Sequence, residues 1–328
     1  MHDHDGHNHP GDDHHDPIGH GHVHANDHGH VHHHHAPASF GLAFAVGISL
    51  NGAYVVAEVV FGILSNSLAL IADAGHNLGD VLSLLVAWVA SRLARRLPTE
   101  RYTYGLRSSS ILAALSNAIV LLLVTGGVSW AAVQKLLAPS PTDGVAMMSV
   151  AAVGVAINAI TALMFASGRK DDLNLRAAFA HMASDALVAL GVVVSGGLIL
   201  VTGWAWLDPV VSLGIGATIV VGTWSLMRES LDLALQATPR SVNRTAVLDY
   251  LQNLPGVREV HDLHIWGMST TETALTAHLV RPGMSLDDSL LARACADLRA
   301  RFSVHHATLQ IEAGGEDHPC ELAPHDVV

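Results

Sequence analysis

The chain has 328 residues, of which 50% are hydrophobic and 14% are charged, and its mean hydropathy is +0.36. This composition favours a membrane protein over a soluble enzyme. The net charge of −12 gives no sign of a nucleic-acid-binding protein, because the basic residues mark loops and form no single patch. The two cysteines, Cys295 and Cys320, are too few for a disulfide framework or for a zinc site built of thiolates.

The first segment, residues 1–36, contains 15 of the 24 histidines, mixed with Asp and Gly. It has almost no apolar residues to bury, so we expect a disordered tail. Such a tail is either only solvated or it collects metal ions loosely, since imidazole is a ligand for zinc, copper and nickel. No basic stretch precedes an apolar one here, and no cleaved signal peptide is predicted.

Six apolar stretches follow the tail. Each is long enough to cross a bilayer as a helix, because about 20 apolar residues span its hydrocarbon core. We therefore predict an all-α, six-helix transmembrane bundle within residues 37–230. The expected spans are approximately 38–61, 67–91, 108–134, 145–167, 175–201 and 207–229.

The distribution of Lys and Arg predicts the orientation in the membrane. These residues are concentrated in the second and fourth connections and after the sixth span, whereas the other connections carry only Lys135. The positive-inside rule then places both termini in the cytoplasm, in a multi-pass protein of the cytoplasmic membrane surrounded by lipid. Trp204 and Trp206, in the fifth connection, fit an aromatic belt at the opposite interface.

Residues 237–313 are predicted to form a soluble cytoplasmic domain of the α+β class. Apolar periodicity and turn signals give the order α-β-β-α-β, with Ser285 as the expected cap of the second helix. Residues 314–328 are expected to be a flexible tail.

Ionisable residues are rare deep in the predicted spans. A charge in the membrane costs upwards of roughly 2.5 kcal/mol even on a lenient scale, so a functional role is the default. His76 and Asp80 are spaced i, i+4 on the second span, and His181 and Asp185 repeat that spacing on the fifth. The deep ionisable residues are Glu58, Asp73, His76, Asp80, His181 and Asp185.

Two imidazoles and two carboxylates from two helices make an N₂O₂ ligand set that suits tetrahedral zinc. One such pair alone would fit an interhelical hydrogen bond equally well, but two matched pairs favour a metal site. Small residues in Gly75-x-x-x-Gly79 and Ala180-x-x-x-Ser184 would let the two helices approach closely. For Asp73 two interpretations stay open, an outer ion-binding residue or a hydrogen bond between helices.

The pairs in "ADAGHNLGD" and "AHMASD", on the second and fifth of six spans, resemble the cation diffusion facilitator family. The His-rich start, the α-β-β-α-β domain and the strand "VHDLHIW" agree, and the resemblance covers about residues 38–313. It implies a ferredoxin-like or metallochaperone-like cytoplasmic domain and a homodimeric transporter that exchanges zinc for protons. It implies no enzyme activity and no organic cofactor. The transport site it implies consists of His76, Asp80, His181 and Asp185, with the His at the first position typical of zinc-preferring members.

A hairpin turn centred on Ser269–Thr270 would place His261 opposite His278 in the cytoplasmic domain. The resemblance implies a regulatory zinc site at His261, His278, His305 and Glu312. The alternative is that these histidines simply occupy exposed strand positions. Further candidate ligands nearby are Asp262, His264, His306, His318 and Cys320.

Competition with protons would make such a site a transporter, because zinc ligands must be deprotonated and imidazole titrates near neutral pH. One alternative is a membrane-anchored zinc buffer or sensor that uses the His-rich tail. An intramembrane metalloprotease would need a catalytic carboxylate, typically in H-E-x-x-H, and that motif is missing from the sequence. A passive channel is disfavoured, since four such ligands would hold the ion too tightly for fast release.

Overall fold

The computed structural model describes residues 42–94, 96–166, 173–283, 287–315 and 320–323. The predicted tail 1–36, Ser285, His318 and most of residues 314–328 lie outside this part of the chain. The first six described helices are α1 (Leu42–Leu64), α2 (Leu68–Ala94), α3 (Ser109–Leu137), α4 (Gly144–Ala166), α5 (Leu173–Thr202) and α6 (Leu207–Ala234).

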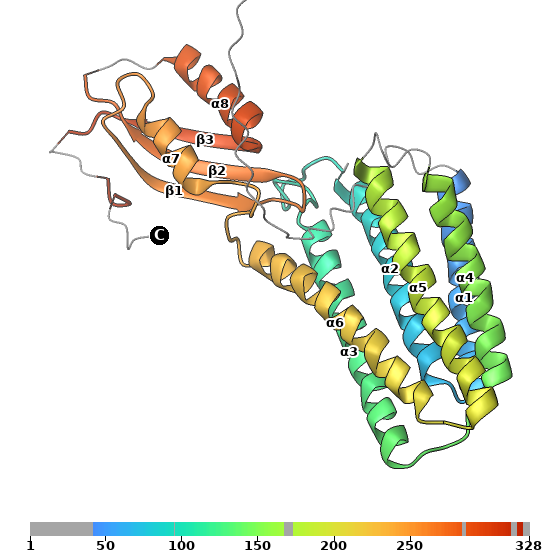
Figure 1. The fold of residues 1–328 in the computed structure, drawn as a ribbon. Helices are drawn as coiled ribbons and strands as arrows, with labels where there is room; N and C mark the ends of the chain where they lie inside the picture. Colours follow the sequence, from blue (N-terminus) through green and yellow to red (C-terminus); the bar gives the residue numbers. More distant parts are fainter. Residues whose placement is uncertain (1–41, 95, 167–172, 284–286, 316–319, 324–328) are drawn as a thin grey trace, which may run out of the picture. The chain divides into compact units, whose positions relative to one another are not determined.

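These six helices form the predicted transmembrane region (Figure 1). Among the described residues, α2 to α6 each contain a stretch long and apolar enough to cross a membrane, and α1 adds a shorter apolar stretch, Ser49–Leu64. Many of their large apolar side chains are exposed, including Leu64, Leu123 and Val201. Such a surface suits contact with lipid chains, which solvate leucine and valine as well as the protein interior does.

Within the bundle, α4 lies along α5 and α3 lies along α6, while α2 contacts α1, α3, α5 and α6 (Figure 1). The contact between α4 and α5 is close because glycines meet there. A Cβ added at Gly144 would lie 2.7 Å from the carbonyl oxygen of Gly196. Residues without side chains thus let the two backbones touch.

A buried ion pair joins three helices at the start of α2. Asp208 of α6 is fully buried and lies 2.9 Å from Nζ of Lys135 on α3. Its carboxylate also accepts hydrogen bonds from Oγ of Ser67 and from the backbone N–H groups of Leu68 and Ala69. Asp208 therefore caps α2 from another helix, satisfying N–H groups that have no partner within α2.

The Asp208–Lys135 pair is absent from the deep ionisable residues predicted above. Lys135 was interpreted only as a loop charge, and Asp208 begins a span instead of lying within it. The signal that could have revealed them is a single Lys in connections that are otherwise free of basic residues. A charge so isolated near a membrane-spanning helix needs a partner.

The C-terminal domain has the predicted order α-β-β-α-β. Asn243 caps the first helix by accepting a hydrogen bond from N–H of Ala246. The cap of the second helix is Asp287, which accepts a hydrogen bond from N–H of Leu290, so the prediction of Ser285 as this cap was wrong. The elements are α7 (Arg244–Gln252), β1 (Glu259–Gly267), β2 (Thr273–Val280), α8 (Asp288–Phe302) and β3 (Val304–Glu312).

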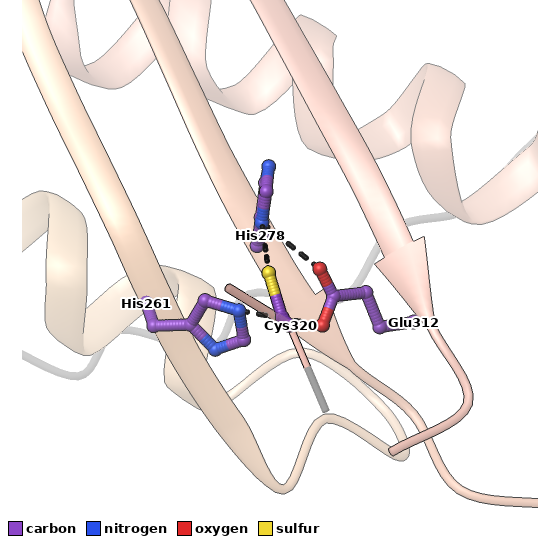
Figure 2. A group of neighbouring side chains, drawn as sticks. All are labelled: His261, His278, Glu312 and Cys320. Carbon is purple, nitrogen blue, oxygen red and sulfur yellow. Dashed lines mark hydrogen bonds and ion pairs between the residues drawn. The ribbon is translucent and has the colours of Figure 1, made fainter. Parts of the chain in front are cut away.

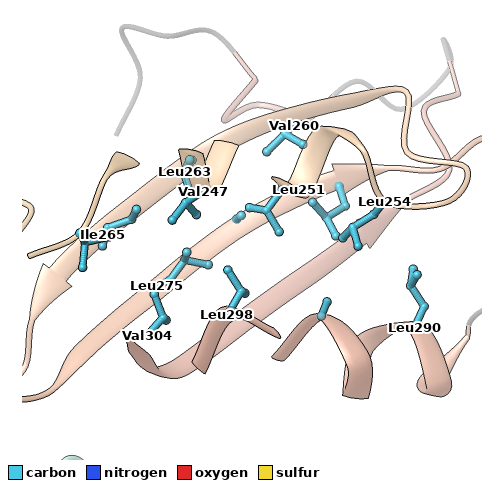
Figure 3. Packing of buried hydrophobic residues seen from close by; sticks show 14 residues of the cluster. Val247, Leu251, Leu254, Val260, Leu263, Ile265, Leu275, Leu290, Leu298 and Val304 are labelled. Carbon is cyan, nitrogen blue, oxygen red and sulfur yellow. The ribbon is translucent and has the colours of Figure 1, made fainter. Parts of the chain in front are cut away.

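The three strands form one sheet in the order β1-β2-β3, with β1 antiparallel and β3 parallel to β2. One face of this sheet packs on α7 and α8 (Figure 3). Leu263, Ile265 and Leu275 project from that face towards helix residues such as Leu251 and Leu298. We call the opposite side the ligand face. Because side chains alternate along a strand, His278 lies on the ligand face between Ala277 and Leu279 of the core.

A β-bulge at Asp262 sets the register of β1. The pairs His264↔Thr276 and Gly267↔Thr273 centre the hairpin on Thr270, not between Ser269 and Thr270 as predicted. Continued without interruption, this register would place His261 opposite Leu279. The register shift between His261 and His264 instead pairs His261 with His278. The prediction that these two histidines face each other is confirmed, and the bulge is its cause.

Candidate metal sites

The four transmembrane residues of the predicted transport site come together between α2 and α5. Nε2 of His76 lies 3.0 Å from Oδ1 of Asp185, and Nε2 of His181 lies 3.3 Å from Oδ2 of Asp80. Nε2 of His181 is also 3.6 Å from the second oxygen of Asp185. Each histidine therefore contacts a carboxylate on the other helix.

The four residues of this group differ in how deeply their side chains are buried. The side chain of Asp185 is 3% exposed and contacts both histidines, whereas those of His76, Asp80 and His181 are 26–32% exposed. In the group that could hold one ion, single ligand atoms of His76, Asp80 and Asp185 lie within 4.8 Å of one another. Asp185 is therefore the most buried residue of the cluster, and His181 contacts both carboxylates but lies outside the group of ligand atoms within 4.8 Å.

The small residues near the cluster do not pack as the sequence suggested. A Cβ at Gly79 would lie 2.9 Å from Cδ2 of Leu121, and one at Gly75 would meet Val124, both on α3. On α5, Ala180 and Ser184 are exposed. The interpretation that both patterns bring α2 against α5 was therefore wrong, because the glycines of α2 face α3.

Glu58 and Asp73 are buried beside the cluster without entering it. Glu58 accepts a hydrogen bond of 3.0 Å from Nδ2 of Asn77, and Asp73 is 2% exposed. Asp73 lies outside the group of ligand atoms formed by His76, Asp80 and Asp185. Both interpretations of Asp73 stay predictions.

A second cluster lies on the ligand face of the sheet (Figure 2). Nδ1 of His278 lies 2.9 Å from Oε1 of Glu312, and Nε2 of His261 lies 3.3 Å from Oε2 of the same carboxylate. Sγ of Cys320 is 3.5 Å from Nδ1 of His278. One ligand atom from each of these four residues lies within 4.8 Å of the others.

The chemistry of this second cluster fits a metal ion. His261 is only 5% exposed, yet neither of its ring nitrogens makes a hydrogen bond in the described structure. A buried imidazole without hydrogen bonds is costly, and metal coordination would satisfy it. Imidazole, carboxylate and thiolate are all ligands that zinc accepts.

His305, the remaining member of the predicted regulatory set, lies apart from it. It begins β3 and is exposed, and its Nδ1 accepts a hydrogen bond from the backbone N–H of Thr273. Glu312 ends the same strand seven residues later, which in an extended chain is about 23 Å away. The exposed His306 is at the same end as His305. The structure thus brings together His261, His278 and Glu312 and separates them from His305.

Asp262 and His264, two further candidates, border the second cluster. Nε2 of His264 lies 2.7 Å from Oδ1 of Asp262, and the other oxygen of Asp262 lies 3.5 Å from Nε2 of His278. Asp262 therefore contacts the ring nitrogen of His278 that points away from Glu312. His318 lies outside the described residues.

Comparison with known proteins places both regions of the chain in one family. Residues 44–233 match the cation efflux transmembrane domain, and residues 239–314 match the cytoplasmic domain of cation efflux proteins. The chain is 34% identical over 279 residues to the metal cation efflux system protein CzcD of Cupriavidus metallidurans, covering 85% of this chain and 87% of that protein.

Two other relatives extend the likeness. The chain is 36% identical over 265 residues to the zinc transporter ZitB of Pectobacterium atrosepticum, covering 80% of this chain and 82% of the relative. It is 29% identical over 270 residues to the cadmium, cobalt and zinc/H(+)-K(+) antiporter of Bacillus subtilis, covering 81% and 86%. The chain therefore belongs to the cation efflux family, the cation diffusion facilitators, and is a multi-pass membrane transporter and not an enzyme.

Proposed function

We propose that the protein exports zinc from the cytoplasm across the cytoplasmic membrane in exchange for protons. The observation that carries this proposal is the double contact between α2 and α5, in which His76 meets Asp185 and His181 meets Asp80. A set of two imidazoles and two carboxylates suits zinc. The names of relatives as zinc transporters and as a cadmium, cobalt and zinc/H(+)-K(+) antiporter support the same substrate class.

Exchange follows from the chemistry of the ligands. A cation that binds the nitrogens of His76 and His181 must displace any proton they carry, so cation and proton occupy the cluster in turn. Facing the cytoplasm, deprotonated ligands would bind zinc. Facing a more acidic exterior, protons would displace the ion and return with the emptied site. The transported ion is thus released by protonation of the same atoms that bound it.

The proposed orientation places both termini and the C-terminal domain in the cytoplasm. Its support is the concentration of Lys and Arg in the second and fourth connections. We further propose that the protein works as a homodimer, as the resemblance implies. The match of residues 239–314 to the cytoplasmic domain of cation efflux proteins supports this assembly.

The C-terminal domain would sense cytoplasmic metal. His261, His278 and Glu312 are the proposed regulatory ligands, and His305 is left out because it lies at the far end of β3. Metal that binds the folded domain stabilises it by mass action as its concentration rises. The His-rich segment 1–36 would collect ions loosely, whereas a buffer built on that segment would have no use for the cluster between α2 and α5.

Zinc uptake by inverted membrane vesicles under an imposed proton gradient tests the transport site. His76→Ala and Asp185→Ala should each abolish uptake, because each removes a ligand and leaves its partner unpaired. Ser184→Ala is the matched control. Ser184 precedes Asp185 on α5, is exposed, and donates only to the carbonyl oxygen of His181 on its own helix. Wild-type uptake by Asp185→Ala at equal protein level would refute the assignment.

A further inference from the structure

Cys320 belongs to the segment that follows the last strand. The chain leaves β3 at Glu312 and passes through Gly314, which has a φ of +67°. A Cβ at Gly314 would lie 2.5 Å from Cγ1 of Val280, so both the conformation and the space require glycine. Eight residues beyond Glu312, Cys320 lies on the ligand face, with its sulfur 3.5 Å from His278 (Figure 2).

The buried ring of His261 is a second observation that points to a metal site beside Cys320. The imidazole of His261 is 5% exposed, points into the cluster and makes no hydrogen bond through either nitrogen. Its nearest charged neighbour there is Oε2 of Glu312, at 3.3 Å from Nε2. Burying such a group is unfavourable unless something accepts the lone pair of its ring. A cation between His261, Glu312 and Cys320 would do so.

The spacing of the four ligand atoms suits one tetrahedral ion. Zinc lies about 2.0 Å from nitrogen or oxygen and about 2.3 Å from sulfur, so in a tetrahedral site with one sulfur the ligand atoms are separated by about 3.3–3.5 Å. In the structure, Nδ1 of His278 lies 2.9 Å from Oε1 of Glu312, Nε2 of His261 lies 3.3 Å from Oε2 of the same carboxylate, and Sγ of Cys320 lies 3.5 Å from Nδ1 of His278. One ligand atom from each of the four residues lies within 4.8 Å of the others.

The second ring nitrogen of His278, Nε2, contacts a carboxylate that can orient the ring for metal binding. Nε2 lies 3.5 Å from Oδ2 of Asp262, while Nδ1 of the same ring faces Glu312 and Cys320. A carboxylate behind a ligating histidine fixes the ring and its tautomer and raises its basicity. Asp262 reaches this position from the bulge of β1, at a φ of +50°.

We propose that the Cys320 thiolate completes a cytoplasmic site for a divalent cation with His261, His278 and Glu312, and that binding ties the C-terminal segment to the sheet. This inference rests on the proposed regulatory site and adds its fourth ligand. The thiol proton leaves to solvent as the sulfur–metal bond forms. Two imidazoles and a thiolate select zinc, cobalt or cadmium over magnesium and calcium, which prefer oxygen ligands alone.

Cobalt substitution in the full-length protein tests the inference, because a sulfur-to-cobalt charge-transfer band appears in the near ultraviolet only when a thiolate binds. Cobalt bound at the His-rich segment or between α2 and α5 gives no such band, since the chain has just two cysteines. We expect the band in the wild type and in the control Cys295→Ser, where the other cysteine lies on α8. We expect its loss in Cys320→Ser and in His261→Ala.

Alkylation gives a second measure that does not depend on cobalt. In Cys295→Ser protein the remaining thiol is Cys320, and saturating zinc should slow its reaction with iodoacetamide. His261→Ala should remove that protection. A thiolate band that persists in Cys320→Ser, a wild type without the band at saturating cobalt, or alkylation unaffected by zinc would overturn the inference.

The same variants separate this inference from the proposals on which it rests. If His261→Ala lowers the number of zinc ions bound per chain and Cys320→Ser does not, the regulatory site stands without its thiolate ligand and the inference fails. If neither changes that number, both fail. Asp185→Ala should lose transport and keep the thiolate band, so the transport site is judged independently.

Discussion

Asp262 shows how the backbone conformation of one residue determines which side chains meet on the ligand face. It adopts a left-handed conformation within a strand, with φ of +50°, where a non-glycine residue is uncommon. This conformation produces the bulge that pairs His261 with His278. The same side chain contacts the ring of His278 and that of His264. Strain of this kind at a cluster of ligands is typical of a functional position.

Substitution of Asp262 should separate its backbone role from its side-chain role. Asp262→Val should lower the stability of the C-terminal domain by about 1–2 kcal/mol, because a β-branched residue resists the left-handed conformation. Asp262→Gly should keep the fold and weaken metal binding at His278 by about 10–100-fold, as expected when the carboxylate behind a ligand is lost. Thermal unfolding and cobalt titration of the full-length variants measure the two effects. Equal stability of the Val and Gly variants would contradict the backbone role.

Sequence spacing predicted the positions of some site residues better than those of others. His76, Asp80, His181 and Asp185 were predictable because helical periodicity puts i and i+4 on one face and few other charges compete in the spans. His305 was assigned to the regulatory set, but strand length carries it away from Glu312. The approach of Cys320 depends on how the chain proceeds after Gly314, which sequence spacing does not encode.

Glycines allow close contact between α4 and α5 in the membrane region. On α5, a Cβ at Gly196 would lie 3.0 Å from the carbonyl oxygen of Gly144 and 3.1 Å from the backbone nitrogen of Met148. Both are backbone atoms of α4, and they cannot move without shifting that helix. Gly191 lies on the same helix with open space around its Cβ position.

Gly196 and Gly191 provide a matched test of the contact between α4 and α5. Gly196→Ala should destabilise the bundle by about 1–3 kcal/mol, as overpacking does in a close-packed contact. Gly191→Ala should be neutral or stabilise α5 by up to about 1 kcal/mol, because alanine favours a helix over glycine. Thermal unfolding in detergent compares them. A Gly196→Ala variant as stable as Gly191→Ala would mean that α4 and α5 pack less closely than described.

The helices and strands were easier to predict than the contacts between them. The six long helices and the α-β-β-α-β order follow from apolar run length and periodicity, and the structure confirms them. The patterns at Gly75–Gly79 and Ala180–Ser184 identified small residues but did not mark the contact between α2 and α5, since they face α3 and an exposed surface. A small-residue pattern specifies a face of one helix and leaves its partner open.

At the scale of the whole molecule, the chain combines a His-rich segment, a transmembrane transport region and a small cytoplasmic-type α+β domain. Each of the last two regions contains its own group of neighbouring candidate ligands. The apolar helices and the α+β domain were predictable from apolar run length and periodicity. The buried Asp208–Lys135 pair was not, because its partners are 73 residues apart and only the fold brings them together.

Deletion of residues 1–36 tests whether zinc transport depends on the His-rich segment. A transporter should keep most of its zinc uptake in inverted vesicles at saturating zinc, because the ligands between α2 and α5 remain. His76→Ala in the shortened protein is the control and should show no uptake. Loss of all uptake in a shortened protein that still reaches the membrane would favour a buffer or sensor built on the His-rich segment.

The buried Asp208–Lys135 pair anchors the start of α2. Leu68 and Ala69 are held to Asp208, and Lys135 ties the same carboxylate to α3. Sliding of α2 along its axis would break these bonds, whereas swinging about the anchored end preserves them. His76 lies about 12 Å and Asp80 about 18 Å along the helix from Leu68. A swing about this end would displace Asp80 about half again as far as His76, so the two ligands that α2 contributes to the cluster would move by different amounts.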